Sequence, residues 1–113
     1  MMDKDLLKAH CIPCEGGVAP LTGAALAQFQ AKVDPAWKIS DDKTYIRRVF
    51  IFKNFATAMA LANKIADIAE TEGHHPDLAV SWGKLAVTLS THAIGGLSEN
   101  DFILARKIDA LTS

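Results

Sequence analysis

The stretch from Glu70 to Asp101, ETEGHHPDLAVSWGKLAVTLSTHAIGGLSEND, decides the fold and carries most of the chemistry of the chain. It contains three of the four histidines, His74, His75 and His92, and a Gly-Lys pair between two β-rich runs. It ends in a helix-capping pattern. We expect this stretch to build an acid–base pocket from the three histidines, with Glu70 in support.

The Gly83-Lys84 pair predicts a two-residue hairpin between strands over residues 77–82 and 85–92. One step beyond the paired residues, this turn would bring His75 opposite His92. The register agrees with the burial pattern, because it gathers on one face the apolar residues that we expect in the core: Leu78, Val80, Trp82, Leu85, Val87 and Leu89. Directly opposed residues have Cβ atoms about 4.5–5.5 Å apart, so the two histidines should lie close together.

His74 would point away from its neighbour His75 on a regular strand. Gly73 and Pro76 flank the pair and favour an irregular segment, which would let His74 join the pocket. Neutral imidazoles also bind zinc or copper, so metal ligation is a rival interpretation of the cluster.

Three acidic residues stand at the end of the preceding helix, where the macrodipole favours cations. We expect Asp67 and Glu72 to be solvated, and Glu70 to act as an electrostatic partner of the histidines one turn further on. The next helix begins near Ser98, after Gly95-Gly96. Ser98 and Asp101 resemble a capping box, which normally has Glu or Gln at the second position, so a structural role is favoured for Asp101.

Upstream of this stretch, apolar periodicity and punctuation predict four further elements. They are a helix from Thr22 to about Lys32, a short strand over residues 37–39, a strand over residues 44–53, and a helix from Asn54 to about Glu72 that ends at Gly73. Both faces of the longer strand are partly apolar. We therefore expect helices to cover one face and something else, such as a partner subunit, to cover the other.

Composition limits the classes of function. The chain has 113 residues and a net charge of −1, which fits one domain over residues 22–113 behind an irregular leader over residues 1–21 and gives no sign of direct nucleic-acid binding. No apolar run approaches the ~20 residues of a membrane span, and the first residues lack the apolar segment of a secretion signal. Two cysteines are too few for a disulfide scaffold, so we expect a cytoplasmic location.

The leader contains His10-Cys11-Ile12-Pro13-Cys14, which a metal or redox site could use. Zinc normally takes four ligands, and no second Cys pair follows. Pro13 and the Gly16-Gly17 pair stand where a redox motif would need a helix. Reduced surface thiols are favoured, and neither a metal nor a cofactor is predicted.

The pattern Glu70-x-x-x-His74-His75-Pro76, followed by Trp82, His92 and Asp101, resembles the signature of the pterin-4a-carbinolamine dehydratases. All seven positions of that motif are met. A looser likeness runs from Trp37 to Leu111, and residues 11–17 look like the start of some bacterial members. Leu78 departs from the pattern, since many relatives have an aromatic residue there.

This resemblance implies an α+β fold in which a four-stranded antiparallel sheet has three helices packed on one face. The order α-β-β-α-β-β-α, reached above from the residues alone, agrees with that fold. The resemblance also implies a homodimer or homotetramer.

Members of this family dehydrate 4a-hydroxytetrahydropterin to quinonoid dihydropterin, which supports tetrahydropterin recycling. The resemblance implies that His74 and His92 are the acid–base pair and that Glu70 favours a protonated imidazole. It implies that His75, Pro76 and Trp82 bind the pterin. Imidazole suits this chemistry, because its ordinary pKa of about 6.5 lets it give or accept a proton near neutrality. A non-enzymatic alternative is a dimerisation scaffold resembling a transcription coactivator, which would not require the set of histidines.

Overall fold

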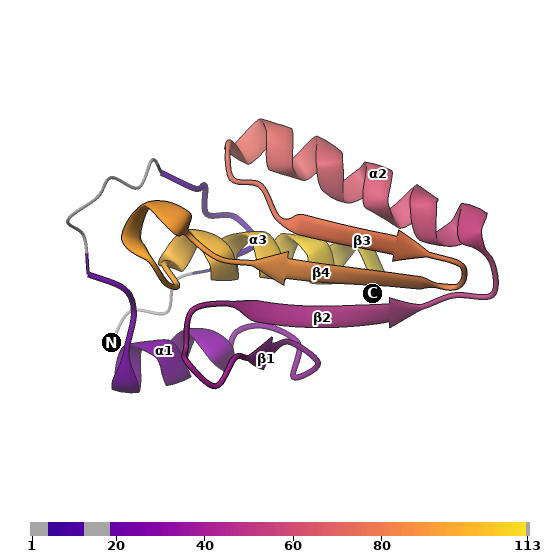
Figure 1. Ribbon diagram of the computed structural model, residues 1–113. Coiled ribbons are helices and arrows are strands. Elements are labelled where there is room, and N and C mark those ends of the chain that lie inside the picture. The colour runs from indigo at the N-terminus through magenta and orange to yellow at the C-terminus, as the bar shows by residue number, and fades with distance from the viewer. Residues whose placement is uncertain (1–4, 13–18, 113) are drawn as a thin grey trace.

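The computed structural model describes residues 5–12 and 19–112, and a single antiparallel sheet organises this part of the chain (Figure 1). The helices are α1 (Gly23–Gln30), α2 (Phe55–Glu72) and α3 (Glu99–Thr112), with a short 3₁₀ helix, η1 (His92–Ile94). The strands are β1 (Lys38–Ile39), β2 (Ile46–Ile51), β3 (Asp77–Ser81) and β4 (Lys84–Leu89). This order of α-helices and strands is the predicted one.

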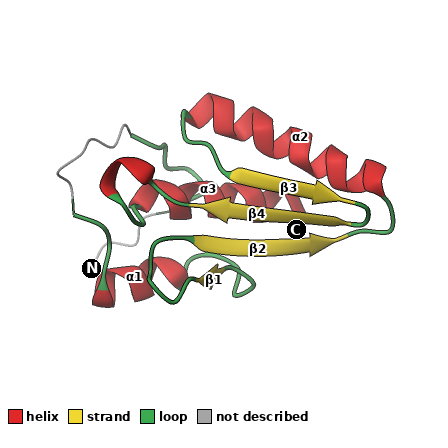
Figure 2. Cartoon of the chain, in the orientation of Figure 1, coloured by secondary structure: helices red, strands yellow, loops and turns green. Residues whose placement is uncertain are grey.

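The strands lie in the order β1-β2-β4-β3, and every neighbouring pair is antiparallel. The three α-helices pack against one face of the sheet, with α3 behind β4 and α2 beside β3 in Figure 2. Alternation along β2 turns Ile46 and Phe50 into the core. On the opposite face, Val49 is 37% and Ile51 is 74% exposed, so the second apolar face of β2 is uncovered in the single chain. No helix in the described part of the chain is long and apolar enough to cross a membrane.

The helix boundaries follow the local signals. Asn54 has an extended backbone, and its side chain accepts a hydrogen bond from the Thr57 N–H at 2.8 Å, which caps α2 as predicted. Gly73 ends α2 with a φ of 68°, the left-handed conformation that glycine adopts readily. Because α2 ends there, the chain turns back toward the sheet immediately before His74.

The predicted hairpin register is wrong by two residues. Ser81 pairs with Lys84 and Val80 with Leu85, so the turn consists of Trp82 and Gly83. Gly83 has a φ of 70°, and a Cβ atom there would lie 3.0 Å from the carbonyl oxygen of Phe52, so the turn requires glycine at this position. A slip of two residues keeps every side chain on its original face, which is why the burial pattern did not expose the error.

Two expectations that depended on this register also fail. Trp82 lies in the turn and is 74% exposed, so it is not a core residue. Strand β4 ends at Leu89, and His92 lies in η1 instead of opposite His75. Continued past the last pair, the observed register would place Ser90 opposite His75.

The N-terminal segment over residues 5–12 packs onto the rest of the chain. Leu6 is 2% exposed and belongs to the core. The Glu72 side chain, expected to be solvated, is only 4% exposed, because residues of this segment cover it. Cys14 and Pro13 lie outside the described residues, so the proposed Cys-x-x-Cys pair is described only at Cys11.

Candidate active site

The three histidines of the 70–101 stretch line one open pocket of about 390 Å³. Its walls come from four places in the chain: the N-terminal segment, the α2–β3 connection, the β4–η1 region and the first turn of α3. The lining residues are Ile12, Gly73, His74, His75, Ser90, Thr91, His92, Ala93 and Asn100. The predicted convergence of the histidines is therefore present, although the register that suggested it is not.

His74 is held by a buried carboxylate. Its Nε2 atom lies 2.6 Å from Oδ1 of Asp101, and the two side chains are 13% and 0% exposed. His74 lies in the irregular connection between α2 and β3, as predicted, and its side chain reaches the first turn of α3. A carboxylate can only accept, so Nε2 donates the hydrogen bond and Nδ1 is the ring nitrogen left for a substrate.

The second oxygen of Asp101 anchors the carboxylate. Oδ2 accepts hydrogen bonds from the Ser98 N–H at 3.0 Å and from the Thr91 hydroxyl at 2.8 Å. The hydrogen bond from the Ser98 N–H is the one that a capping box forms between the N-cap backbone and the side chain three residues later. The Thr91 and Ser98 hydroxyls lie 2.7 Å apart. Asp101 therefore caps α3 and orients His74 at the same time.

His92 reaches the pocket from a closed loop. The Thr91 N–H donates to the Gly96 carbonyl at 2.8 Å, and Gly95 adopts a φ of 67°, which reverses the direction of the chain. His92 is exposed, and among the described residues its ring makes no hydrogen bond or ion pair. Its imidazole can therefore give a proton to a bound molecule or take one without breaking a contact within the chain.

His75 is paired with Glu70. Nε2 of His75 lies 2.5 Å from Oε2 of Glu70, and the side chains are 59% and 76% exposed. The predicted support from Glu70 is thus directed at His75 and not at His74. Water screens an ion pair at this level of exposure, so its energetic contribution is about 0–1 kcal/mol.

The N-terminal segment forms one wall of the pocket. Asn100 holds the backbone of Ile12 at two points, because its Oδ1 accepts from the Ile12 N–H at 3.0 Å and its Nδ2 donates to the Ile12 carbonyl at 2.5 Å. Next to it, the Cys11 N–H donates to Oε1 of Glu72 at 2.7 Å. These contacts fix Ile12 beside His74 and His75 in the lining.

The Glu72 side chain is the buried group to which the N-terminal segment is attached. Nδ1 of His10 lies 3.0 Å from Oε2, and the Lys107 ammonium lies 3.6 Å from it. Burial alone would raise the pKa of the Glu72 carboxyl. The hydrogen bonds from Cys11 and His10, together with the nearby charges of Lys107 and His10, outweigh that effect, so the pKa of Glu72 lies below its usual value.

The remaining predicted residues lie outside the lining. Pro76 follows His75 directly, and Trp82 lies in the turn at the opposite end of the β3–β4 hairpin. Among the described residues, no three His, Cys, Asp or Glu side chains are grouped as metal ligands would be. His10 contacts Glu72, and the Cys11 Sγ lies 3.6 Å from the Asn100 carbonyl oxygen, to which it donates.

Sequence reasoning missed the contacts made by Asp101, Asn100 and Ile12. For Asp101 a signal existed, because it occupies the last position of the seven-residue motif. Asn100 and Ile12 are 88 residues apart in the chain, and no local pattern indicates that they meet.

Comparison with known proteins gives a consistent result. The model of the family described as pterin 4 alpha carbinolamine dehydratase matches residues 19–111. Many curated relatives carry the name pterin-4-alpha-carbinolamine dehydratase by inference. One from Methylococcus capsulatus is 43% identical over 96% of this chain and 94% of its own length, and one from Aromatoleum aromaticum is 46% identical over 97% of each.

Two solved structures are similar. A protein from Brucella melitensis, described as a transcriptional coactivator/pterin dehydratase, superposes with a TM-score of 0.77 at 33% identity, over 83% of this chain and 99% of its own. A pterin dehydratase-like protein described as a RuBisCO assembly factor in the alpha-carboxysome gives a TM-score of 0.59 at 23% identity, over 69% and 90%. The second likeness concerns the fold alone.

Proposed function

The chain belongs to the pterin 4 alpha carbinolamine dehydratase family, and from that premise we propose that it dehydrates 4a-hydroxytetrahydropterin by histidine acid–base catalysis, in support of tetrahydropterin recycling. The observation that carries the proposal is the contact between His74 and the buried Asp101, in a pocket that His75 and His92 also line. Family membership supports a dehydratase in general, and this geometry motivates the finer assignment.

The proposed reaction needs two proton transfers. The C4a–O bond breaks as the hydroxyl gains a proton and leaves as water, and N5 loses its proton as the C4a=N5 double bond forms. The electron pair of the N–H bond becomes that double bond, so no external oxidant or reductant takes part. A positioned general acid and base contribute about 10²–10⁴-fold to such a step.

We assign the base to His74 and the acid to His92. With Nε2 donating to Asp101, the neutral imidazole of His74 carries its lone pair on Nδ1, which can accept the N5 proton. The cation that forms would be stabilised by the adjacent carboxylate. His92 has no competing contact among the described residues, and in its protonated form it can donate to the departing hydroxyl.

The other predicted residues have supporting roles in the proposal. Glu70 would position His75, and His75 with Pro76 would hold the pterin. Trp82 lies at the far end of the hairpin, so its predicted contact with pterin would have to be made from a neighbouring copy of the chain. We accordingly propose that the chain forms a homodimer or homotetramer in the cytoplasm. The exposed Val49 and Ile51 on the open face of the sheet support the association of copies.

The direct test is turnover of synthetic 4a-hydroxytetrahydropterin by the purified protein. The chain offers a matched control, because His10 is a histidine outside the pocket. We expect His74→Ala and His92→Ala each to lower kcat by about 10²–10⁴-fold, and His10→Ala to leave it within about threefold of the unchanged protein. A wild-type rate no faster than spontaneous dehydration would refute the function. Full activity in both pocket variants would refute the assigned residues alone.

A scaffold role without catalysis is the second candidate, favoured by the open apolar face of β2 and by the coactivator description of the Brucella relative. That role needs an exposed surface but no histidine set. It therefore gives no reason for three histidines to line one pocket, and the enzymatic proposal accounts for more of the structure. Failure of turnover together with recovery of a stable protein partner would favour the scaffold.

A further inference from the structure

Ile12 combines an exposed side chain with a fixed backbone. It is 70% exposed, and it lines the pocket of His74, His75 and His92, which we call the histidine pocket. A single exposed apolar residue is ordinary at a protein surface, so exposure alone indicates no role. Ile12 differs from such residues because side chains from two other elements hold the backbone of its segment.

Two nearly buried side chains hold the backbone of residues 11 and 12. Asn100, 4% exposed, accepts from the Ile12 N–H at 3.0 Å and donates to the Ile12 carbonyl at 2.5 Å. The Glu72 side chain, also 4% exposed, accepts from the Cys11 N–H at 2.7 Å. A backbone that is fixed before a ligand arrives lowers the conformational entropy that binding would otherwise cost. The Ile12 side chain is therefore presented to the pocket by a preorganised backbone.

The same two helix ends also position His74. Asn100 stands directly before Asp101, whose Oδ1 lies 2.6 Å from Nε2 of His74. Glu72 is the last residue of α2 and precedes His74 by two positions. Because the end of α2 and the first turn of α3 hold both features, Ile12 keeps a fixed place relative to the His74 ring.

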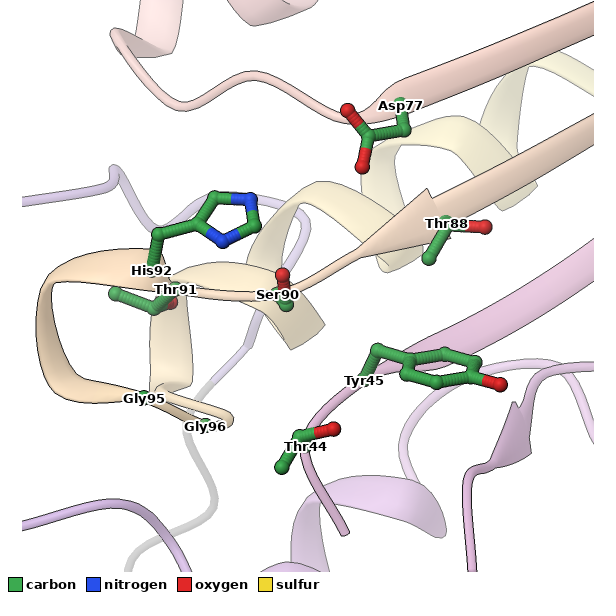
Figure 3. A pocket seen from close by; sticks show the side chains of 9 residues that line it. All are labelled: Thr44, Tyr45, Asp77, Thr88, Ser90, Thr91, His92, Gly95 and Gly96. Carbon is green, nitrogen blue, oxygen red and sulfur yellow. The ribbon is translucent and has the colours of Figure 1, made fainter. Parts of the chain in front are cut away.

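Ile12 supplies an apolar surface that the rest of the lining lacks. Among the described lining residues it has the only large apolar side chain, and the others offer imidazoles, hydroxyls, an amide and two small residues. His92 also borders a neighbouring pocket, together with Asp77 and Tyr45, and Ile12 does not line that one (Figure 3). A pterin is a flat fused ring with hydrogen-bonding groups along its edge. The polar lining groups match that edge, and Ile12 matches a face of the ring.

Taken with the proposed function, on which it rests, this arrangement leads us to propose that Ile12 packs against one face of the bound pterin ring and that Asn100 positions Ile12 for this contact. The ring covers apolar surface of Ile12 that water otherwise contacts, which favours binding. The ring keeps this contact throughout the reaction, so the contact stabilises the substrate complex and the transition state alike. The N-terminal segment is thereby part of the substrate site.

The direct test detects the contact in the complex with 6-methylpterin, a stable oxidised pterin. Isoleucine δ1-methyl groups are labelled with ¹³C, and the Ile12 signal is identified by its loss in Ile12→Val, because valine has no δ1 carbon. We expect this signal to shift as the pterin is added and to show a nuclear Overhauser effect to the pterin protons. Ile51 is the matched control, since it is 74% exposed and lies outside the histidine pocket, so its signal should not shift.

Kinetics separate this contact from a general effect on the fold. We expect Ile12→Ala to raise KM for 4a-hydroxytetrahydropterin about tenfold with kcat unchanged, and Ile12→Leu to keep KM within about twofold of the unchanged protein. Leu7→Ala is the control, because it shortens a partly exposed leucine of the same segment outside the pocket, and KM should stay the same. Asn100→Ala should raise KM as well. Since Asn100 acts through Ile12, combining Asn100→Ala with Ile12→Ala should raise KM no further than Ile12→Ala alone.

Several results would overturn the inference. An Ile12 signal that stays unshifted while 6-methylpterin saturates the protein would do so, as would the absence of any binding of this pterin. Equal increases of KM in Leu7→Ala and Ile12→Ala would show that the segment acts only through the fold. Increases that multiply in the double variant would refute positioning by Asn100. The proposed function fails separately, if the unchanged protein does not turn over 4a-hydroxytetrahydropterin, and the methyl signals then still decide whether Ile12 contacts a bound pterin.

Discussion

The substitution Asp101→Asn isolates the part of the site that orients His74. Asparagine has the shape of aspartate but one oxygen in place of two. If that oxygen keeps the hydrogen bonds from Ser98 and Thr91, now at the Oδ2 position, the amide NH₂ faces Nε2 of His74. An NH₂ group donates, so Nε2 must accept and the ring proton moves to Nδ1. His74 then lacks the lone pair with which it takes the N5 proton.

The expected loss follows from this change of tautomer. Removing a general base costs about 10²–10⁴-fold in kcat, which corresponds to about 3–5 kcal/mol in the activation free energy. The free energy of unfolding should fall much less, by about 1–2 kcal/mol, because the two capping hydrogen bonds persist but now end on a neutral acceptor. The proposal therefore predicts a large decrease in kcat together with a small decrease in the free energy of unfolding.

Two measurements on the same protein check it. Turnover of 4a-hydroxytetrahydropterin above the spontaneous rate gives kcat, and ¹⁵N NMR of the imidazoles gives the tautomer of His74. Asp109→Asn is the matched control, since Asp109 is a second nearly buried carboxylate in α3, where it accepts from the Trp37 indole at 2.8 Å and contacts Arg48 at 2.6 Å, away from the pocket. It should lower stability and leave kcat per folded molecule unchanged. Asp101→Asn with kcat within threefold of wild type and Nδ1 unprotonated in neutral His74 would refute the reasoning.

Two further predictions concern the carboxylates of α2. Glu70→Gln should lower kcat/KM by no more than about fivefold, since the Glu70–His75 pair is exposed and such pairs are worth about 0–1 kcal/mol; a loss beyond a hundredfold would show instead that Glu70 contacts the substrate. Glu72→Gln should lower the free energy of unfolding at pH 7 by about 1.5–3 kcal/mol, because Glu72 is nearly buried and accepts from Cys11 and His10. The folded-state pKa of Glu72 is lowered, so its contribution is fully present above the unfolded pKa of about 4.5 and disappears as the pH falls through the folded value. Urea denaturation of the unchanged protein and of Glu72→Gln, from pH 7 to pH 3, measures this contribution. A difference in the free energy of unfolding that stays constant over that range would contradict the prediction.

The elements of the fold were predictable because each is bounded by residues with a local mechanism. Asn54 caps α2 and Gly73 ends it, and both act within four residues of their own position. The hairpin register lacked such a signal. Gly83 can serve as the first or the second residue of a two-residue turn, and both choices keep Leu78 and Val80 on the core face. The two choices differ in whether Trp82 or Lys84 lies in the turn, and an exposed tryptophan in a turn is the less expected outcome.

The packing of the N-terminal segment could not be predicted for a different reason. Glu72 reads as a solvated residue from its own neighbours, and it is buried by residues about 60 positions earlier in the chain. No residue near Glu72 in the sequence indicates these distant partners. The same holds for Asn100, whose amide matches both backbone groups of Ile12.

Asp101 combines a helix cap with a contact to His74. The capping pattern Ser98-x-x-Asp101 is present, and it favoured a structural assignment that the Ser98 contact confirms. A carboxylate nevertheless has two oxygens, and the cap uses only Oδ2. By tying Oδ2 to the first turn of α3, where the helix dipole also favours a negative charge, the cap fixes Oδ1 at 2.6 Å from His74. The cap is therefore the means by which the carboxylate is positioned. A variant that loses the cap should disturb His74 as well, whereas Asp101→Asn should change the His74 tautomer while the cap survives.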